Sequence, residues 1–255
     1  MIRKVDRIIL FGTSHVAKDE AQNIKQSIEE YTPDVVCLEL DSQRLKKVLN
    51  PNDNPKGKKQ TYKTIKELGA FGFLFAQLAG YVQKKVGKSI KIDPGIDMKT
   101  AYEKSRELSI PISLIDLDIK LTMKKLSKLP LHKKISLMSS LFLKSFKKEY
   151  REMLKSFDLN KLPEEKMISQ MIKILQKETP DLYKILIEDR NIHMSNRLLK
   201  LKEEHPGYIM AFVGAGHLEG MEKYLREKIN QNSTQEISFS FKLDEDLSGN
   251  NLDVN

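Results

Sequence analysis

The sequence predicts an α/β fold with a mostly parallel central sheet, flanked by helices, and a long helical insertion before the last parallel strand. Short apolar runs over residues 5–12, 35–40, 110–115 and 208–213 have the length and β-branched content of buried strands. A polar helix expected over Lys18–Tyr31 separates the first two runs. Such strand–helix–strand units join parallel strands through a right-handed crossover.

Helical spacing of apolar residues predicts the other elements. Thr32-Pro33 ends the first helix, because the residue before a proline is biased away from helical geometry. From about residue 120 to 205 the pattern is helical throughout, with breaks at Pro130, Pro163 and Pro180. The further helices expected outside this insertion cover Ser42–Leu49, Met98–Leu108 and Leu218–Ile229.

The remaining segments complete one domain over residues 1–243. Residues 50–59 read as a solvated loop. The apolar run 68–82 has about fifteen residues, where a membrane span needs roughly twenty. It predicts a buried helix or a partner surface, with a re-entrant membrane contact as the further alternative. Residues 236–243 alternate polar and apolar and predict an edge strand. The acidic segment 244–255 is expected to be a disordered tail.

Composition restricts the class of protein. With 44 Lys and Arg against 35 Asp and Glu, the net charge is +9. There is no Trp and no interleaving of basic with aromatic residues, so we expect no nucleic-acid partner. The single cysteine, Cys37, excludes a disulfide framework. With no secretory leader pattern and no transmembrane run, the expected location is cytoplasmic.

Unusual polar residues follow the predicted strands. His15 comes after the first, Glu39 after the second, Asp116 and Asp118 after the third, and His217 after the fourth. In open α/β sheets, sites form outside the carboxyl ends of the strands. These side chains should therefore converge if the four strands are parallel and adjacent.

The spelling G-x-x-H occurs at both ends of the chain, in Gly12–His15 and in Gly214–His217. About 0.2 such matches are expected by chance from the glycine and histidine content. Glycine permits a sharp turn and close backbone approach, and Gly12, Gly214 and Gly216 would do so beside a bound cofactor. Two histidines and a carboxylate could bind Zn or Mn with a position left open for water. Alternatively, the histidines cap strand ends and Glu39 only pairs with Arg44.

Six blocks together resemble the TraB/PrgY family, which is grouped with the Tiki proteins and erythromycin-esterase-like folds. They span about residues 5–230 in the family's order. In this sequence they read GTSHV, ELDSQR, PGIDM, LIDLDI, EDRNIHM and VGAGHLEG.

The resemblance implies a metal-dependent peptidase site of paired G-x-x-H motifs and an intervening Glu. By position, the metal ligands are His15, Glu39 and His217, and Glu39 is either a ligand or the general base. The family blocks add Arg44, Arg190, Asn191 and Met194, and of these Arg44, Arg190 and Asn191 are candidate catalytic residues. Two departures weaken any role for their positions: Leu117 stands where Arg is common, and Asp97 stands where Glu is common.

Several alternatives remain open at this point. Arg44 and Arg190 could clamp a substrate carboxylate, or could serve only to hold helices to the sheet. The cleft could capture a peptide without cutting it, as the pheromone-shutdown association of the family name allows. The basic amphipathic segment 120–160 could lie on an anionic membrane, or pack within the protein or a homo-oligomer.

Overall fold

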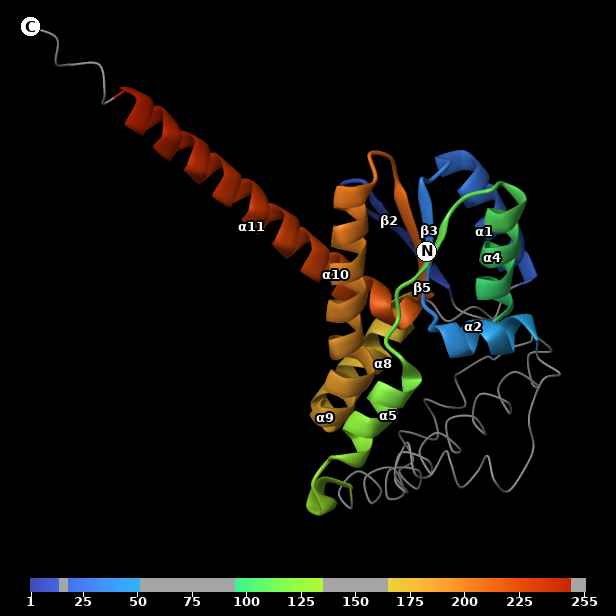
Figure 1. Cartoon of the computed structure of the whole chain (residues 1–255). Helices are drawn as coiled ribbons and strands as arrows, with labels where there is room; N and C mark the ends of the chain where they lie inside the picture. Colours follow the sequence, from blue (N-terminus) through green and yellow to red (C-terminus); the bar gives the residue numbers. More distant parts are fainter. Residues whose placement is uncertain (14–17, 51–94, 135–164, 249–255) are drawn as a thin grey trace, which may run out of the picture.

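A five-stranded sheet forms the centre of the protein, as the computed structural model shows for residues 1–13, 18–50, 95–134 and 165–248 (Figure 1). The strand order is β1-β2-β5-β3-β4. Strands β2, β5, β3 and β4 are mutually parallel, as the sequence predicted, and β1 is antiparallel to β2. The strands cover Ile2–Val5 (β1), Ile8–Thr13 (β2), Val35–Leu38 (β3), Ile112–Leu114 (β4) and Ile209–Gly214 (β5).

The first strand predicted from the sequence, 5–12, includes a turn in the structure. Val5 ends β1, Ile8 begins β2, and the two strands form a hairpin through Asp6 and Arg7. Asp6 adopts a left-handed φ of 53°. Aspartate tolerates this geometry better than most residues, so the turn needs no glycine and its sequence signal is weak.

Helices cover both faces of the sheet (Figure 1). Helix α1 (Lys18–Tyr31) has the predicted bounds and packs with α4 (Ile96–Glu107) on one face. Helices α10 (Asp189–Glu204) and α11 (Ala215–Ser248) pack on the other. The result is a three-layer α/β/α arrangement.

Side-chain alternation in the central strands separates the two cores. In β2, Ile8 and Leu10 face α10 and α11, whereas Ile9 and Phe11 face α1 and α4. Phe11 packs on Phe212 of the neighbouring β5, with ring centroids 5.2 Å apart. Strands buried on both faces carry near-continuous apolar runs, which is why the sequence identified them.

Further helices lie at the carboxyl edge of the sheet, the edge where its parallel strands end (Figure 1). One of these helices, α2 (Ser42–Leu49), precedes the expected insertion. The described parts of the insertion itself are helical apart from short connections. They form α5 (Ile119–Ser127), α8 (Glu165–Glu178), α9 (Pro180–Tyr183) and the π-helical turn η1 (Lys184–Glu188) at this edge, and continue into α10. The predicted loop 50–59 (except Asn50), the apolar helix 68–82 and much of the basic segment lie outside the described residues.

The predicted edge strand over 236–243 is wrong, because α11 continues through this segment to Ser248. No glycine or proline occurs between Met221 and Ser248. Extending an existing helix adds one hydrogen bond per residue without a new nucleation step, and this outweighs a short alternating pattern. The first five residues of the expected tail belong to this helix, and 249–255 lie outside the described residues.

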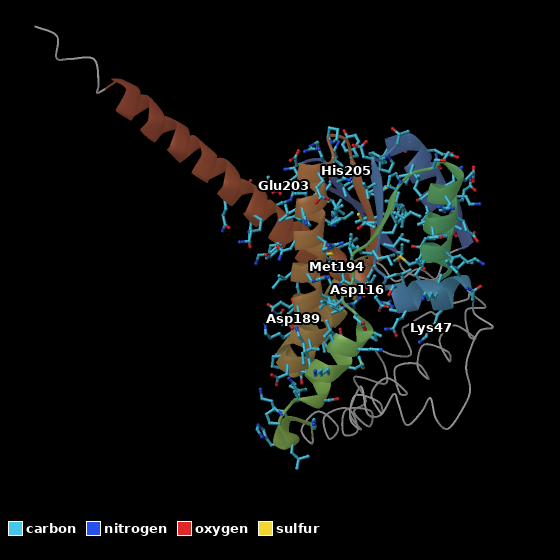
Figure 2. All side chains as sticks on the ribbon, in the orientation of Figure 1. Lys47, Asp116, Asp189, Met194, Glu203 and His205 are labelled. Carbon is cyan, nitrogen blue, oxygen red and sulfur yellow. The ribbon has the colours of Figure 1, made fainter. Side chains whose placement is uncertain are left out.

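Two positions on α10 show how this helix is oriented. Met194, which the family blocks singled out, is fully buried in the core, and His205 lies at the end of the helix far from Asp116 (Figure 2). Over the described ranges, no helix is both long enough and apolar enough to cross a membrane.

Close packing between β2 and α11 explains Gly12. A Cβ built on Gly12 would lie 2.1 Å from Cδ1 and 2.7 Å from Cγ of Leu218. The absent side chain therefore lets the helix approach the strand, which is a structural role for this glycine next to the one expected from the sequence.

Gly12→Ala should lower the free energy of unfolding by about 1–3 kcal/mol, because the added methyl group overpacks the interface. Urea denaturation measures the change. The penalty should shrink in a Leu218→Ala background, and Gly216→Ala should have a small effect, since its Cβ would come no closer than 3.3 Å to Ile172. Equal penalties for Gly12→Ala in both backgrounds would contradict this packing role.

Candidate functional site

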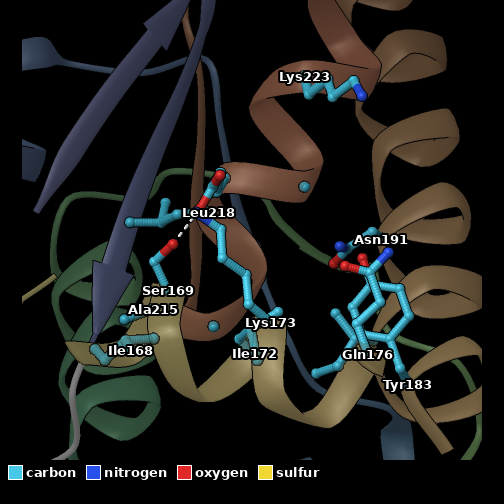
Figure 3. A pocket seen from close by; sticks show the side chains of 14 residues that line it. Ile168, Ser169, Ile172, Lys173, Gln176, Tyr183, Asn191, Ala215, Leu218 and Lys223 are labelled. Atoms are coloured by element: carbon cyan, nitrogen blue, oxygen red, sulfur yellow. Dashed lines mark hydrogen bonds between the residues drawn. The ribbon is translucent and has the colours of Figure 1, made fainter. Parts of the chain in front are cut away.

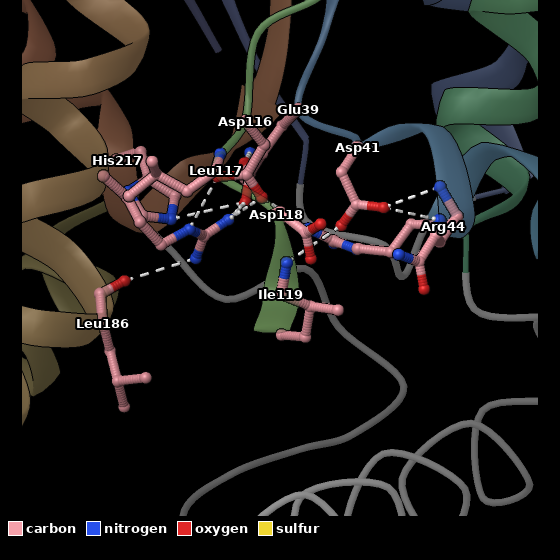
Figure 4. Close-up of polar contacts among 12 residues, drawn as sticks. Glu39, Asp41, Arg44, Asp116, Leu117, Asp118, Ile119, Leu186 and His217 are labelled. Atoms are coloured by element: carbon pink, nitrogen blue, oxygen red, sulfur yellow. Dashed lines mark hydrogen bonds and ion pairs between the residues drawn. The ribbon is translucent and has the colours of Figure 1, made fainter. Parts of the chain in front are cut away.

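The carboxyl edge of the sheet brings together most of the polar residues singled out in the sequence (Figure 4). Glu39 directly follows β3, Asp116 follows β4, and His217 lies in the first turn of α11 after β5. All three are buried, at 7%, 9% and 5% relative exposure. The convergence expected from parallel strands is therefore present for these residues.

His15 lies outside the described residues. It comes two residues after Thr13, which pairs with Gly214 at the end of β5. Two residues of chain reach at most about 7 Å. Among the residues that the structure does describe, no group of three or more His, Cys, Asp or Glu side chains is placed to hold a metal ion.

Glu39 is held by groups from three separate elements. Its Oε2 accepts a hydrogen bond of 2.6 Å from the backbone amide of Gly214. Its Oε1 is paired with the guanidinium of Arg190 from α10 and lies 3.4 Å from Nε2 of His217. The carboxylate thus has a partner on both oxygens despite its burial.

The surroundings of Glu39 favour its ionised form. Burial opposes ionisation, but the charge of His217 when protonated, the charge of Arg190, and hydrogen bonds from His217 and the Gly214 amide outweigh it. The pKa of Glu39 is therefore held well below its usual range. Conversely, the carboxylates of Glu39 and Asp116 raise the pKa of Arg190 against the effect of burial. Both groups are charged at neutral pH.

Arg190 crosslinks the ends of two strands. Its Nε and Nη2 donate to Oδ1 and Oδ2 of Asp116 at 2.9 and 2.8 Å, while Nη2 also contacts Glu39. Such a bidentate fork is specific to arginine. The fourth contact, from Nη1 to the carbonyl of Leu186 at 3.2 Å, ties the same side chain to η1. All three nitrogens of the Arg190 guanidinium therefore contact oxygens of the protein itself.

Arg44 contacts the same carboxylate from the other side. Its Nη1 lies 2.5 Å from Oδ2 of Asp116, and its side chain is 36% exposed. The alternative expected from the sequence was a pair of Glu39 with Arg44, but the guanidinium of Arg44 pairs with Asp116. Because Arg44 is the more open of the two arginines, it is the one whose remaining donors face solvent.

Asp41 and Asp118 serve as helix caps. Oδ1 of Asp41 accepts from the backbone amides of Gln43 and Arg44 at the start of α2. Oδ1 of Asp118 accepts from the amide of Lys120 at the start of α5. Since β4 ends at Leu114, Asp116 and Asp118 do not share one strand face, and only Asp116 joins the cluster around Arg190.

A π-helical turn precedes Arg190 and Asn191. The turn η1 (Lys184–Glu188) links α9 to α10 without a break. One extra residue per turn rotates the helix that follows, and such insertions are frequent at functional sites. Here the residues immediately after the turn reach the sheet edge: Arg190 contacts Glu39 and Asp116, and Asn191 contacts His217.

Asn191 fixes the ring of His217. Oδ1 of Asn191 lies 2.6 Å from Nδ1 of His217, and both residues are buried. When Nδ1 carries the proton and donates it to this oxygen, Nε2 is left as an acceptor facing Glu39. Two acceptors 3.4 Å apart need a proton or a cation between them.

The donor set fits a divalent cation in part. Two ligand atoms that share a tetrahedral ion at about 2.1 Å each lie about 3.4 Å apart, which is the separation of His217 Nε2 and Glu39 Oε1. A ligating histidine commonly donates its other ring nitrogen to an oxygen, as Asn191 provides here. The third ligand predicted from the sequence, His15, lies outside the described residues.

The comparisons with known proteins point to one protein family. The family model described as TraB/PrgY/gumN matches residues 2–236. The chain belongs to this family. It is 31% identical over 232 residues to an uncharacterized protein of Methanocaldococcus jannaschii, covering 88% of this chain and 55% of that protein. It is 23% and 21% identical over 246 residues to TraB domain-containing proteins of Bos taurus and Homo sapiens, covering 88% of this chain and 64% of each. It thus spans between about half and two thirds of the length of these relatives.

Sequence reasoning missed one glycine of this TraB-family site. A Cβ on Gly220 would lie 2.2 Å from Nδ2 of Asn191, so Gly220 makes the room in which Asn191 holds His217. The signal was present in the block GAGHLEG, whose last glycine sits in a helix interior, where glycine is ordinarily unfavourable. Gly216 instead packs towards Ile172 of α8.

Arg190→Gln should lower the free energy of unfolding by about 3–5 kcal/mol at pH 7, because two buried carboxylates lose their charged partner. In the native protein, the pKa of Glu39 is lowered. Its contribution to the free energy of unfolding is therefore fully present above pH ~4.3, the ordinary pKa of a glutamate, and is lost as the pH falls through the pKa of Glu39 in the folded protein. Without Arg190, burial raises that pKa, so the difference between variant and native protein should shrink from pH 7 to 4. Chemical denaturation across pH measures both.

The exposed Arg197 of the same helix provides the control for this change. Arg197→Gln should alter stability by less than about 0.5 kcal/mol at any of these pH values. A pH-independent penalty for Arg190→Gln would argue against the assigned role.

Gly220→Ala should displace Asn191 and change the tautomer balance of His217, as read from its ¹⁵N ring resonances. Alanine usually stabilises a helix interior by about 1 kcal/mol relative to glycine, and this gain should be absent here. Gly216→Ala should leave the His217 resonances in place. An unchanged tautomer in Gly220→Ala would show that Asn191 does not depend on this space.

Proposed function

We propose that this TraB-family protein is a metal-dependent hydrolase that acts on peptide bonds, with His15, Glu39 and His217 holding a divalent ion, Zn or Mn. The observation that carries the proposal is the placement of His217. Its Nδ1 is held by Asn191, and its Nε2 lies 3.4 Å from Glu39 in a buried cluster. A bound ion of this kind lowers the pKa of a coordinated water and polarises a scissile carbonyl.

The chain's own residues prepare this site. Asn191 orients the imidazole, while Arg190 and the Gly214 amide hold the Glu39 carboxylate ionised and fixed. Preorganised groups of this kind need not reorganise when substrate binds. Glu39 offers Oε1 as a ligand, or the same atom as a base for water, and both roles require the ionised form. Arg44, with donors left facing solvent, is the residue suited to a substrate carboxylate.

One observation favours the second candidate, capture of a peptide without cleavage. The Arg190 guanidinium already occupies Oε1 of Glu39, the oxygen an ion would need, and both oxygens of Asp116. A cation bound at Glu39 would therefore share that oxygen with a guanidinium, at some electrostatic cost. A cytoplasmic location, homo-oligomer formation and peripheral contact with anionic membrane remain predictions.

Untagged protein purified without chelator should contain about one equivalent of Zn or Mn by elemental analysis. His15→Ala combined with His217→Ala should reduce the content below about a tenth. His132→Ala with His205→Ala is the matched control, since His132 is exposed and His205 lies at the far end of α10, and it should retain the metal. Full retention in the His15/His217 variant would rule out the proposed ligands.

A peptide assay separates the two candidate functions. Cleavage of a peptide library, detected by mass spectrometry, should stop on chelation, resume on adding back Zn or Mn, and be lost in Glu39→Gln. Capture alone predicts instead that bound peptide is recovered intact and that binding survives chelation.

A further inference from the structure

A cavity of about 220 Å³ lies beside the His217 cluster, between α8, the turn η1 and the first turns of α11 (Figure 3). Glu39, Arg190 and His217 do not line it. It shares Asn191 with that cluster, and the helical turn that carries His217 also lines the cavity through Ala215, Gly216 and Leu218. Cavity and cluster are therefore neighbours with one buried side chain in common.

The size and the wall of the cavity suit a branched or aromatic side chain. Cavities of about 150 Å³ already accommodate benzene when they are apolar. Here the apolar wall is made by three isoleucines and a leucine from three elements: Ile168, Ile172, Ile187 and Leu218. Burying an apolar side chain of leucine size there would be favourable because its surface leaves water.

Polar groups of the lining are available to a ligand. Within the part of the chain that the structure describes, the Tyr183 hydroxyl, the Gln176 amide and the Lys173 ammonium have no hydrogen-bond partner in the protein. Burial and the carboxylates of Glu188 and Glu219 raise the pKa of Tyr183. The Tyr183 hydroxyl therefore stays protonated and can donate.

The charge of the lining favours an anion. Lys173 and Lys223 supply two positive charges, and Glu219 supplies one negative charge. Ser169 already donates to Oε2 of Glu219 at 2.8 Å (Figure 3). The amide groups of the first turn of α11 add the positive end of the helix dipole at Ala215 and Gly216. The lining thus combines an apolar wall with a net positive rim.

We infer that this cavity binds the C-terminal residue of a peptide, with its apolar side chain against Ile168, Ile172 and Leu218 and its carboxylate at Lys173 and Lys223. That the ligand is a peptide rests on the proposed function, whereas the preference for an apolar carboxylate rests on the lining alone. A ligand in the cavity affects the His217 ring through Asn191, which lines the cavity and holds that ring. The cavity is then a specificity site of the same cleft.

Isothermal titration of the full chain in the presence of chelator tests this, with acetyl-Ala-Ala-Leu as the probe. The C-terminal amide of the same peptide should bind at least fivefold more weakly, as should the free acid ending in Asp. Hexanoate, which has the carboxylate and an apolar chain but no peptide groups, should also bind at least fivefold more weakly. The His217 ring resonances should shift as the peptide is added.

Variants locate the binding to the cavity. Lys173→Glu should weaken peptide binding at least tenfold, and Ile172→Phe, which fills the cavity, should do so as well. Lys177→Glu, an exposed lysine of the same helix that does not line the cavity, should stay within threefold. If Ile172→Phe does not fold, Lys173→Glu and the amide probe carry the test.

Two results would overturn the inference. One is equal affinity for acid and amide, with Lys173→Glu within twofold of the native protein. The other is hexanoate binding as tightly as the peptide, which would remove the peptide as the ligand. These titrations contain no metal and need no turnover. Peptide binding in the cavity can therefore be refuted even if the protein contains the expected metal, and it can be confirmed even if the protein never cleaves a peptide.

Discussion

The site depends on one buried carboxylate. An ionised group removed from water costs several kcal/mol unless partners replace its hydration. Glu39 obtains these partners from three elements distant in sequence: the Gly214 amide ends β5, Arg190 lies in the first turn of α10, and His217 lies in the first turn of α11. Satisfying Glu39 therefore fixes the position of both helices against the carboxyl edge of the sheet. The fold and the candidate site are held by the same contacts.

Two glycines set how closely these parts can approach. Gly12 leaves room for Leu218, which brings the start of α11 against β2, and Gly220 leaves room for Asn191. Both effects act on the segment that carries His217, one on its backbone and one on its ring orientation. The glycines of the G-x-x-H region thus contribute through packing, in addition to any approach of backbone to ligand.

Much of the fold could be predicted from the sequence because its signals are local. The strands are apolar runs buried on both faces, and α1 and α2 have clear polar starts and stops. Parallel pairing of these strands is enough to predict that Glu39, Asp116 and His217 lie at one edge of the sheet. The β1–β2 hairpin was missed because Asp6 makes its turn without glycine. The end of α11 was misread because its alternation resembles a strand.

The partners within the site could not be predicted, since pairing depends on three-dimensional reach. The sequence offered Arg44 to Glu39 by proximity, yet Arg190, 151 positions away, takes that carboxylate. Asp116 receives two arginines, while Asp118, two residues later, caps a helix. The choice follows from where β4 ends, a boundary that sequence patterns leave uncertain by several residues. Gly220 was overlooked because its role concerns a side chain on another helix.

The most direct test of this account is anomalous diffraction from crystals of the untagged protein grown with zinc. We expect one strong peak about 2.1 Å from both Nε2 of His217 and Oε1 of Glu39, with His15 as a further ligand and Nδ1 of His217 still held by Asn191. A peak elsewhere, or an ordered His217–Glu39 pair without zinc at saturating concentration, would contradict it.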